Sequence, residues 1–408
     1  MIMRAATPYF NYRERRVEWP LLVAVAGLMV LGALFVASAT LAHAGADQRP
    51  WFRQGWFRQV IWYGLGTGLA VVAARSDYRR IMRWAMVAYW GSIAALVLVL
   101  VPGIGTTHGW GARRWIDLGV LQFQPSELAK LTTIMALAGY LCRPPADLRR
   151  ARTFFTALGL AGLPFVLVLL EPDLGSALVF LPVGVVMMFV AGVPGRYLRR
   201  LIGAGLAGML LLVADVFWLP PEWQPIKLEP YQQRRIMVYF GHPVIPPDAT
   251  EAERIAALRA YRDAAYNVDQ ALISVGSGGL WGKGWRQGTQ NALGYLPRGV
   301  AHNDFIFSVI AEESGFVGSV LVLGLYSVVF FSGLKIASKA RDALGKLLAV
   351  GVVSLLFCHV FINIGMNIRL MPVTGLPLPL LSYGGTFVLC TLLALGLLHN
   401  VYTHRRDY

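Results

Sequence analysis

The sequence predicts an all-α, polytopic membrane protein with ten transmembrane helices and one large extracytoplasmic loop between the seventh and eighth helices. Three observations support this fold class. The chain has 408 residues, of which 56% are hydrophobic and only 14% are charged. Its apolar residues occur in runs of about twenty, the length that crosses a bilayer core of roughly 30 Å. Its basic residues form short clusters in alternate connections between these runs.

The apolar runs give the order of the helices. The predicted spans are residues 19–42, 57–74, 84–101, 126–141, 153–170, 174–192, 200–218, 305–334, 346–368 and 385–402. They divide the chain into seven helices within 1–218, a loop over 219–304 and three helices within 305–408. We expect these parts to form one integral membrane domain.

The distribution of charge predicts the orientation of the helices. The formal net charge of +15 is compatible with nucleic-acid binding, but the cations cluster near both termini and in the even-numbered connections. Lys and Arg favour cytoplasmic connections. We therefore expect both termini in the cytoplasm, the 219–304 loop outside, and no nucleic-acid partner. Cys142, Cys358 and Cys390 lie in or beside spans, which predicts neither a disulfide framework nor a metal site.

The segment from Tyr266 to Gly318 places polar chemistry at the mouth of a membrane span. It contains glycines, aromatic residues and several cations, and its last loop residue is Asp304. Partial burial where the loop becomes an apolar helix raises the pKa of a carboxyl group toward a value useful for a base. Asp304 is therefore our candidate base, with capping of the following helix as the alternative.

Polar residues near three other spans have both structural and functional interpretations. Trp115 lies in a turn rich in glycine and arginine, where it either anchors the membrane interface or binds a lipid-linked phosphate or sugar. Glu127 and Lys130 share a face of the fourth span, as a buried ion pair or as reactive groups. Asp173 follows a proline in an outer turn, where it either caps the sixth span or faces a cavity below the large loop.

The glycine-rich run over 276–284 does not match a nucleotide-binding loop. A phosphate loop that ends at Lys283 requires glycine at position 277 and Ser or Thr at position 284, but the chain has Ser277 and Gly284. We interpret the run as a close-packed turn that leaves Lys283 and Arg286 available to an anionic group. A second irregular segment, 369–387, contains three prolines, which preclude a regular helix. Broken backbone at membrane depth requires contact with protein or with a water-filled cavity.

Five motifs together resemble the SEDS family of bacterial shape, elongation, division and sporulation proteins. They are FQPSELAK, EPDLGSALV, GSGGLWGKGWRQGTQ, HNDFIFSVIAEESGFVG and VTGLPLPLLSYGGT. The resemblance covers essentially the whole chain, and the glycine-rich motif is closer to the elongation members than to the division members. The chain departs from the family pattern at Asn303, where threonine is usual, in the longer lead over 297–301, and in an extended segment near 243–263.

The resemblance implies a peptidoglycan glycosyltransferase of the bacterial cytoplasmic membrane. Such an enzyme polymerises lipid II on the outer face during cell elongation and releases undecaprenyl diphosphate. The implied partners are a class B penicillin-binding transpeptidase and other membrane proteins of the elongation complex. The family's essential loop aspartate matches Asp304, its loop tryptophan matches Trp115, and its hairpin aspartate matches Asp173. The pair on its fourth helix matches Glu127 and Lys130.

The chemistry of glycan polymerisation agrees with these residue types. It requires a base for the acceptor 4-hydroxyl group and cations for the diphosphate leaving group, and Lys283, Arg286 and Arg235 are the candidate cations. No cofactor is certain. A divalent cation, Mg or Mn, is compatible with the carboxylates, but no ligand spacing predicts one. The alternatives are a flippase or transporter of the lipid-linked precursor, a division-type polymerase, and a scaffold that only activates the transpeptidase.

Overall fold

A helix lies over each of the ten predicted spans. The computed structural model describes residues 17–41, 50–103, 105–106, 114–117, 119, 122–218, 230–241, 250–296 and 300–405. The helices over the predicted spans are α1 (Trp19–Leu41), α2 (Gly55–Arg75), α4 (Ala85–Leu100), α5 (Pro125–Leu141), α7 (Ala151–Leu170), α8 (Leu174–Ala191), α9 (Gly195–Trp218), α13 (Ile306–Ser338), α14 (Ala343–Asn367) and α15 (Gly385–Thr403). Most helix ends agree with the predicted ends within three residues.

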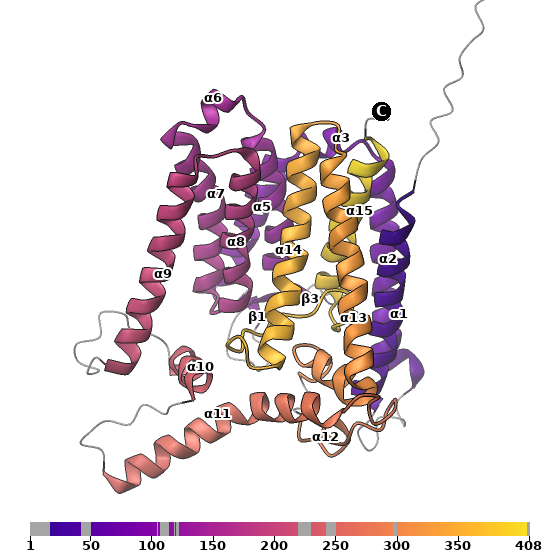
Figure 1. Cartoon of the computed structure of the whole chain (residues 1–408), viewed down its shortest axis with the longest axis vertical. Helices are drawn as coiled ribbons and strands as arrows, with labels where there is room; N and C mark the ends of the chain where they lie inside the picture. Colours follow the sequence, from indigo (N-terminus) through magenta and orange to yellow (C-terminus); the bar gives the residue numbers. More distant parts are fainter. Residues whose placement is uncertain are drawn as a thin grey trace, which may run out of the picture.

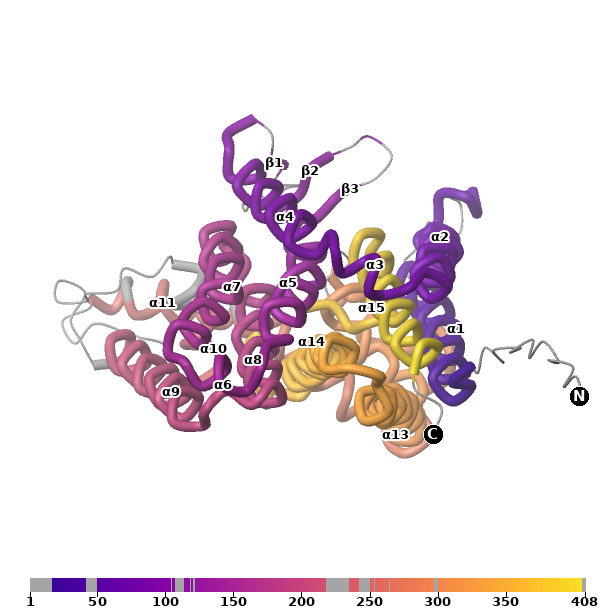
Figure 2. Tube along the Cα trace, turned by 90° about the horizontal axis from the view of Figure 1, so that it is seen from above, coloured from indigo at the N-terminus to yellow at the C-terminus, as the bar shows by residue number. Residues whose placement is uncertain are grey.

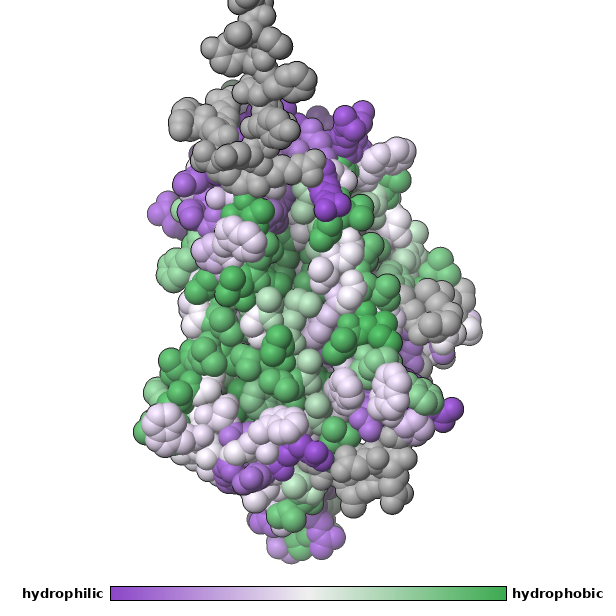
Figure 3. Space-filling view, turned by 90° about the vertical axis from the view of Figure 1, so that its right-hand side faces the viewer, coloured by the Kyte–Doolittle hydropathy of each residue, from purple (hydrophilic) through white to green (hydrophobic). Residues whose placement is uncertain are grey.

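Apolar length identifies the chain as a multi-pass membrane protein. Within the described ranges, seven helices are long and apolar enough to cross a membrane, namely α1, α7, α8, α9, α13, α14 and α15. Helix α4 is also apolar but has only 16 residues. Apolar side chains form a broad band around the middle of one face, with hydrophilic side chains toward both ends (Figure 3). The full count of ten spans and the sidedness of the membrane stay predictions.

The remaining elements are short, apart from one long helix in the predicted loop. They are η2 (Trp51–Arg53), α3 (Tyr78–Met82), α6 (Pro145–Leu148), α10 (Pro230–Phe240), α11 (Glu251–Ser277), α12 (Thr289–Ala292), β1 (Gly105–Thr106), β2 (Trp115–Asp117) and β3 (Gln122–Phe123). The strands form one antiparallel sheet in the order β1-β2-β3. The sequence predicted no strand, because segments of two or three residues are too short to show an alternating pattern.

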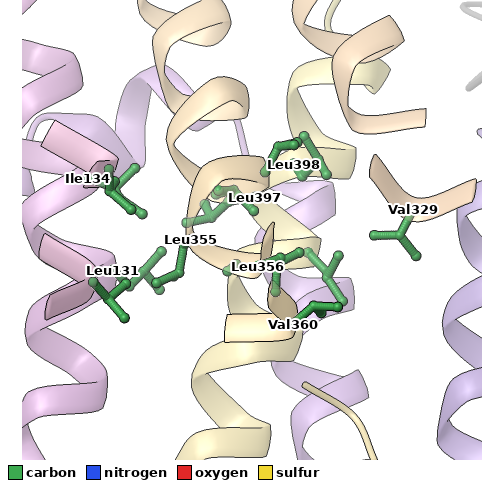
Figure 4. Close-up of a cluster of buried hydrophobic side chains, with 14 of the residues drawn as sticks. Leu131, Ile134, Val329, Leu355, Leu356, Val360, Leu397 and Leu398 are labelled. Carbon is green, nitrogen blue, oxygen red and sulfur yellow. The ribbon is translucent and has the colours of Figure 1, made fainter. Parts of the chain in front are cut away.

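Helix α14 lies near the middle of the bundle. It packs against α5, α8, α13 and α15, and the view from above shows it among them (Figure 2). Leucines and other aliphatic side chains from these helices form the core, including Leu131 of α5, Leu355 and Leu356 of α14 and Leu397 of α15 (Figure 4). The core therefore surrounds α14 on several sides. Helix α9 contacts mainly α8 and lies at the edge of the bundle (Figures 1 and 2).

The loops with chemical character lie at one end of the bundle. The sheet, the turn between α7 and α8, and helices α10 to α12 are all at this end, whereas α1 begins and α15 ends at the other (Figure 1). This arrangement brings together segments that are far apart in the sequence. Residues 219–229, 242–249 and 297–299 of the predicted loop lie outside the described residues, as do the predicted cytoplasmic N-terminal residues 1–16.

Helix α13 is interrupted at Gly315, and the glycine-rich run fills the interruption. Gly315 has φ 66° and ψ −160°, which only glycine adopts readily. The backbone N–H groups of Lys283 and Gly284 donate to the carbonyl groups of Glu312 and Glu313, each at 3.0 Å. A Cβ atom at Gly282 would lie 2.2 Å from the Glu313 oxygen. The run is therefore the close-packed turn that the sequence predicted.

Candidate functional site

Asp304 lies in the turn that leads into α13, at the end of the bundle that carries the loops. Its backbone carbonyl accepts hydrogen bonds from the amide groups of Asn363 at 2.9 Å and Asn367 at 3.2 Å, both on α14. The N-cap position of α13 is Phe305, and no side chain caps the helix. The carboxyl group of Asp304 therefore does not cap α13. The main chain of Asp304 is held in place by the two hydrogen bonds from α14.

The surroundings of the Asp304 carboxyl group raise its pKa to about 6. The largest cause is desolvation by the surrounding protein, although the residue is only half-buried. The positive charges of Arg235 and Arg114 lower the pKa, and the negative charge of Asp173 raises it. A carboxyl group with this pKa is mostly ionised at neutral pH and holds a proton more readily than an exposed aspartate. These are the properties that general-base catalysis requires.

Asp173 has the capping role that the sequence offered as one interpretation, and it also lies near other charged and polar groups. It is the N-cap of α8, where its Oδ1 atom accepts a hydrogen bond from the Ser176 backbone N–H at 3.1 Å. Its other oxygen lies 3.5 Å from the Gln124 amide, and Arg114 lies 4.0 Å from Oδ1. Asp173 therefore caps a helix and also belongs to the group of charges around Asp304.

Arg114 fastens the turn between α7 and α8 to the sheet. Its Nε atom donates to the Glu171 carbonyl at 3.2 Å, and its Nη2 atom donates to the Pro172 carbonyl. The Glu171 side chain is buried, and neither carboxyl oxygen has a hydrogen-bond partner among the described residues. Desolvation, and then the charge of Asp173, raise the pKa of Glu171 to about 8 despite the opposing charge of Arg114. Glu171 is therefore mostly protonated and uncharged at neutral pH.

Glu127 and Lys130 form the buried ion pair that the sequence offered as one interpretation. The Lys130 Nζ atom lies 2.8 Å from Glu127 Oε1, and both side chains are almost completely buried. Lys130 also lies 3.1 Å from the Nε2 atom of His359 on α14. The charge of Asp173 acts on Glu127, so the ion pair is electrostatically connected to the group around Asp304.

Arg235 and Trp115 are far apart in the sequence but lie at the same end of the bundle. Arg235, on α10, is half-buried, and its Nη1 atom lies 3.5 Å from the Thr374 carbonyl. Thr374 belongs to the irregular segment over 369–384, which we call the broken segment. A Cβ atom at Gly375 would lie 3.4 Å from Asp304 Oδ2, so this segment borders the carboxyl group. Trp115 is half-buried in β2, next to Arg114.

Lys283 and Arg286 belong to a different set of contacts. The Lys283 ammonium group lies 2.6 Å from Glu312 Oε1 and 2.7 Å from Thr289 Oγ1. Glu312 is completely buried and lies two turns beyond Asp304 in α13. The Arg286 guanidinium group reaches the Leu41 carbonyl at the end of α1, at 3.5 Å. The structure thus places Lys283 against Glu312 of α13 and Arg286 beside the end of α1.

The structure therefore gathers part of the predicted site around Asp304 and adds residues to it. The charges of Asp173 and Arg235 change the pKa of Asp304. The ion pair of Glu127 and Lys130 is buried in the core. Sequence reasoning did not single out Arg114 or His359. Arg114 was signalled only by its place beside Trp115, and His359 is a lone histidine in an apolar run. No three His, Cys, Asp or Glu side chains of the described ranges could hold a metal ion. Within these ranges, the carboxylates thus do not provide a three-ligand site for the Mg or Mn ion considered above.

Comparison with known proteins agrees with the motifs. Residues 19–407 match the family of cell cycle proteins FtsW, RodA and SpoVE. The chain is 34% identical over 381 residues to the peptidoglycan glycosyltransferase MrdB of Escherichia coli K12, covering 93% of each chain.

Two solved structures are similar over nearly the whole chain. One belongs to a peptidoglycan synthase complex that coordinates polymerization and crosslinking, with 32% identity, a TM-score of 0.73, and coverage of 96% of this chain and 99% of the other. The other is the rod shape determining protein RodA of Thermus thermophilus, with 31% identity, a TM-score of 0.63, and coverage of 96% and 98%. The chain therefore belongs to the family of FtsW, RodA and SpoVE, which is the SEDS family that its motifs resemble.

Proposed function

We propose that this protein is a peptidoglycan glycosyltransferase that polymerises lipid II on the outer face of the cytoplasmic membrane. The observation that carries the proposal is the state of Asp304, a half-buried carboxyl group with a pKa of about 6 at the loop end of a membrane bundle. The name of the MrdB relative supports the same reaction. The outer location rests on the cations of the opposite connections, which favour the cytoplasm.

In the proposed reaction, Asp304 takes the proton of the acceptor sugar's 4-hydroxyl group. The hydroxyl oxygen forms a bond to the anomeric carbon of the lipid-linked donor, and the bond from that carbon to the phosphate oxygen breaks. Undecaprenyl diphosphate leaves with the electron pair, and Asp304 later releases its proton to water. Cations that face the leaving diphosphate stabilise the charge that develops on it.

We assign the diphosphate first to Arg235 and Arg114, because their charges act on Asp304. Lys283 and Arg286 are the second choice, since Glu312 already neutralises Lys283. Trp115 and Asp173 line the same end of the bundle and are proposed to contact the sugar or the phosphate. Glu127 and Lys130 are almost completely buried, so we propose that they support the substrate site from below.

We further propose that the enzyme acts in cell elongation together with a class B penicillin-binding transpeptidase. The glycine-rich motif supports the elongation role. The similarity to a chain of a synthase complex that coordinates polymerization with crosslinking supports the partner. Depletion in cells distinguishes the two roles of the family, because loss of an elongation enzyme gives round cells and loss of a division enzyme gives filaments.

The direct test is glycan synthesis by the purified protein and its transpeptidase partner from lipid II. We expect polymer with the wild type and none with Asp304→Asn. Asp263→Asn is the matched control, because Asp263 is an exposed aspartate of the same predicted loop and should keep full activity. Translocation of the lipid II headgroup without polymer would identify a flippase instead. Absence of both activities, with stimulation of the transpeptidase, would identify a scaffold.

A further inference from the structure

His359 connects the buried ion pair to the broken segment that borders Asp304. Its side chain lies on α14 and is 2% exposed. The Nε2 atom lies 3.1 Å from Lys130 Nζ, and the Nδ1 atom lies 3.2 Å from the Pro377 carbonyl oxygen. The imidazole ring therefore bridges a charged side chain of α5 and the main chain of the broken segment.

The chemistry of the two neighbours determines where the imidazole proton lies. An ammonium group only donates hydrogen bonds, so the Nε2 atom that faces Lys130 must accept one. The proton then lies on Nδ1, which donates to the carbonyl group of Pro377. Lys130 also donates to Glu127 at 2.8 Å. The imidazole is thus neutral and held in one tautomer by contacts on both sides.

His359 belongs to a stripe of three polar residues on one face of α14. Asn363 and Asn367 follow at intervals of four residues, which places all three side chains on neighbouring turns of the same face. Asn363 donates to the Leu376 carbonyl at 2.7 Å and to the Asp304 carbonyl at 2.9 Å. The stripe therefore holds the broken segment at two successive carbonyl groups and holds the main chain of Asp304 beside it.

The surroundings of His359 leave little room for water to replace these contacts. A cavity of about 10 Å³ lies beside the ring and is lined by Glu127, Leu131, Leu355, Phe387 and Cys390 among others. This volume is close to the minimum that a single water requires. The leucines of this wall also belong to the packed core (Figure 4). Loss of the imidazole would thus leave Lys130 and the Pro377 carbonyl short of polar partners.

We infer that His359 is a positioning residue, which sets the place of the broken segment against Asp304 through its hydrogen bond to Pro377. The ion pair fixes the ring, the ring fixes the segment, and the segment forms one wall beside the Asp304 carboxyl group. This role rests on the proposed function only in that Asp304 is taken as the base. The imidazole itself touches neither substrate nor the reacting atoms.

Three substitutions separate the two contacts of the ring. His359→Phe keeps the ring but removes both hydrogen bonds. His359→Asn keeps a donor near the Nδ1 position, toward Pro377, whereas His359→Gln keeps a polar group near the Nε2 position, toward Lys130. We expect His359→Phe to lower kcat by about 100-fold with little change in KM, because a displacement of about 1 Å at a catalytic group costs that much. His359→Asn should restore more activity than His359→Gln.

Two further measurements distinguish positioning from a general loss of structure. A moved wall changes the desolvation of Asp304, so His359→Phe should shift the acid limb of the pH profile, whereas partial unfolding lowers activity equally at every pH. Hydrogen exchange of residues 374–382 should become faster in His359→Phe. The matched control is His399→Phe, which changes a half-buried histidine of α15 near the opposite end of the bundle and should alter neither measurement.

Normal kcat and normal exchange in His359→Phe would overturn the inference. So would a loss of activity with an unshifted acid limb and faster exchange throughout the bundle. If the wild type itself makes no glycan polymer, the proposed function fails, but exchange of 374–382 still tests whether His359 holds the broken segment. Failure of the two proposals is therefore distinguishable.

Discussion

Lowering the pH from 7 to 5 should slow glycan polymerisation about tenfold if Asp304 is the base. With a pKa of about 6, about nine-tenths of the Asp304 carboxyl groups are ionised at pH 7 and about one-tenth at pH 5. With the ordinary value of 3.8, the group would stay almost fully ionised at pH 5 and the rate would hardly change. The acid limb of the pH profile therefore reports the environment that the structure gives to this carboxyl group.

Two substitutions should move the midpoint of this limb in opposite directions. The charge of Arg235 lowers the pKa of Asp304, so Arg235→Gln should move the midpoint to higher pH. The charge of Asp173 raises that pKa, so Asp173→Asn should move the midpoint to lower pH. Asparagine still caps a helix, which preserves the start of α8. Arg235→Lys keeps the charge and serves as the control for the first change.

The assay is the initial rate of polymer formation between pH 4.5 and 7.5 at lipid II concentrations well below KM, because kcat/KM reports the pKa of the free enzyme. The upper limit stays below the pKa of about 8 of Glu171, so that group stays mostly protonated over the whole range. The position of the midpoint is compared, and not the height of the curve, because either residue could also bind substrate. An unmoved midpoint in both variants, or two shifts in the same direction, would refute the electrostatic assignment of Asp304.

Three further predictions concern stability, measured by thermal unfolding of the purified protein. Glu127→Gln and Lys130→Met should each cost about 3–5 kcal/mol, because each leaves a buried charge without its partner, and the double change should cost clearly less than the sum; strictly additive losses would show that the pair is not coupled. Gly282→Ala should cost more than about 1 kcal/mol, because φ is +80° and the added Cβ atom meets a main-chain oxygen of α13 at 2.2 Å. Gly276→Ala, within α11 and with open space around it, should be neutral or slightly stabilising, and equal losses in both variants would contradict this explanation. Asp304→Asn should stabilise the protein by up to about 3 kcal/mol above pH 6, since a pKa raised from 3.8 to about 6 opposes ionisation in the folded state. This gain should decrease as the pH falls from 6 to 4 and vanish below the unfolded pKa, so a gain that is independent of pH would require another cause.

The helices could be predicted from the sequence because a bilayer restricts the chain strongly. Apolar runs in lipid must satisfy their own backbone hydrogen bonds, so each long run becomes a helix. The predicted span 174–192 coincides with α8 (Leu174–Ala191) almost residue for residue. The prediction was less accurate for α9, which begins at Gly195 and not at 200. Arg196 and Arg199, which precede the predicted span, belong to the first two turns of this helix, because long cationic side chains can extend from a helix end toward water.

Polar segments were harder to predict, because local patterns do not show which distant groups they meet. Helix α11 continues to Ser277, so it includes the first residues of the run over 276–284 that the sequence predicted to be a turn. The interruption of α13 at Gly315 lies within an apolar run, and only its contact with the glycine-rich turn reveals it. Lys283 was expected to be available to an anion, and the structure places it against Glu312. Its role toward substrate stays a prediction.

Composition, run length and motifs are properties of the linear chain, so the sequence alone was enough to predict the membrane fold, the family and most of the candidate site residues, but not Arg114 or His359. The tertiary structure alone decided which of these residues meet. Burial by segments far away in the chain raises the pKa of Asp304, and so does the charge of Asp173, against the opposing charges of Arg235 and Arg114. His359 gains its contacts with Lys130 and the Pro377 carbonyl only because α14 packs against α5 and the broken segment. Electrostatic and hydrogen-bond energies depend on distance in space, and sequence separation does not encode that distance.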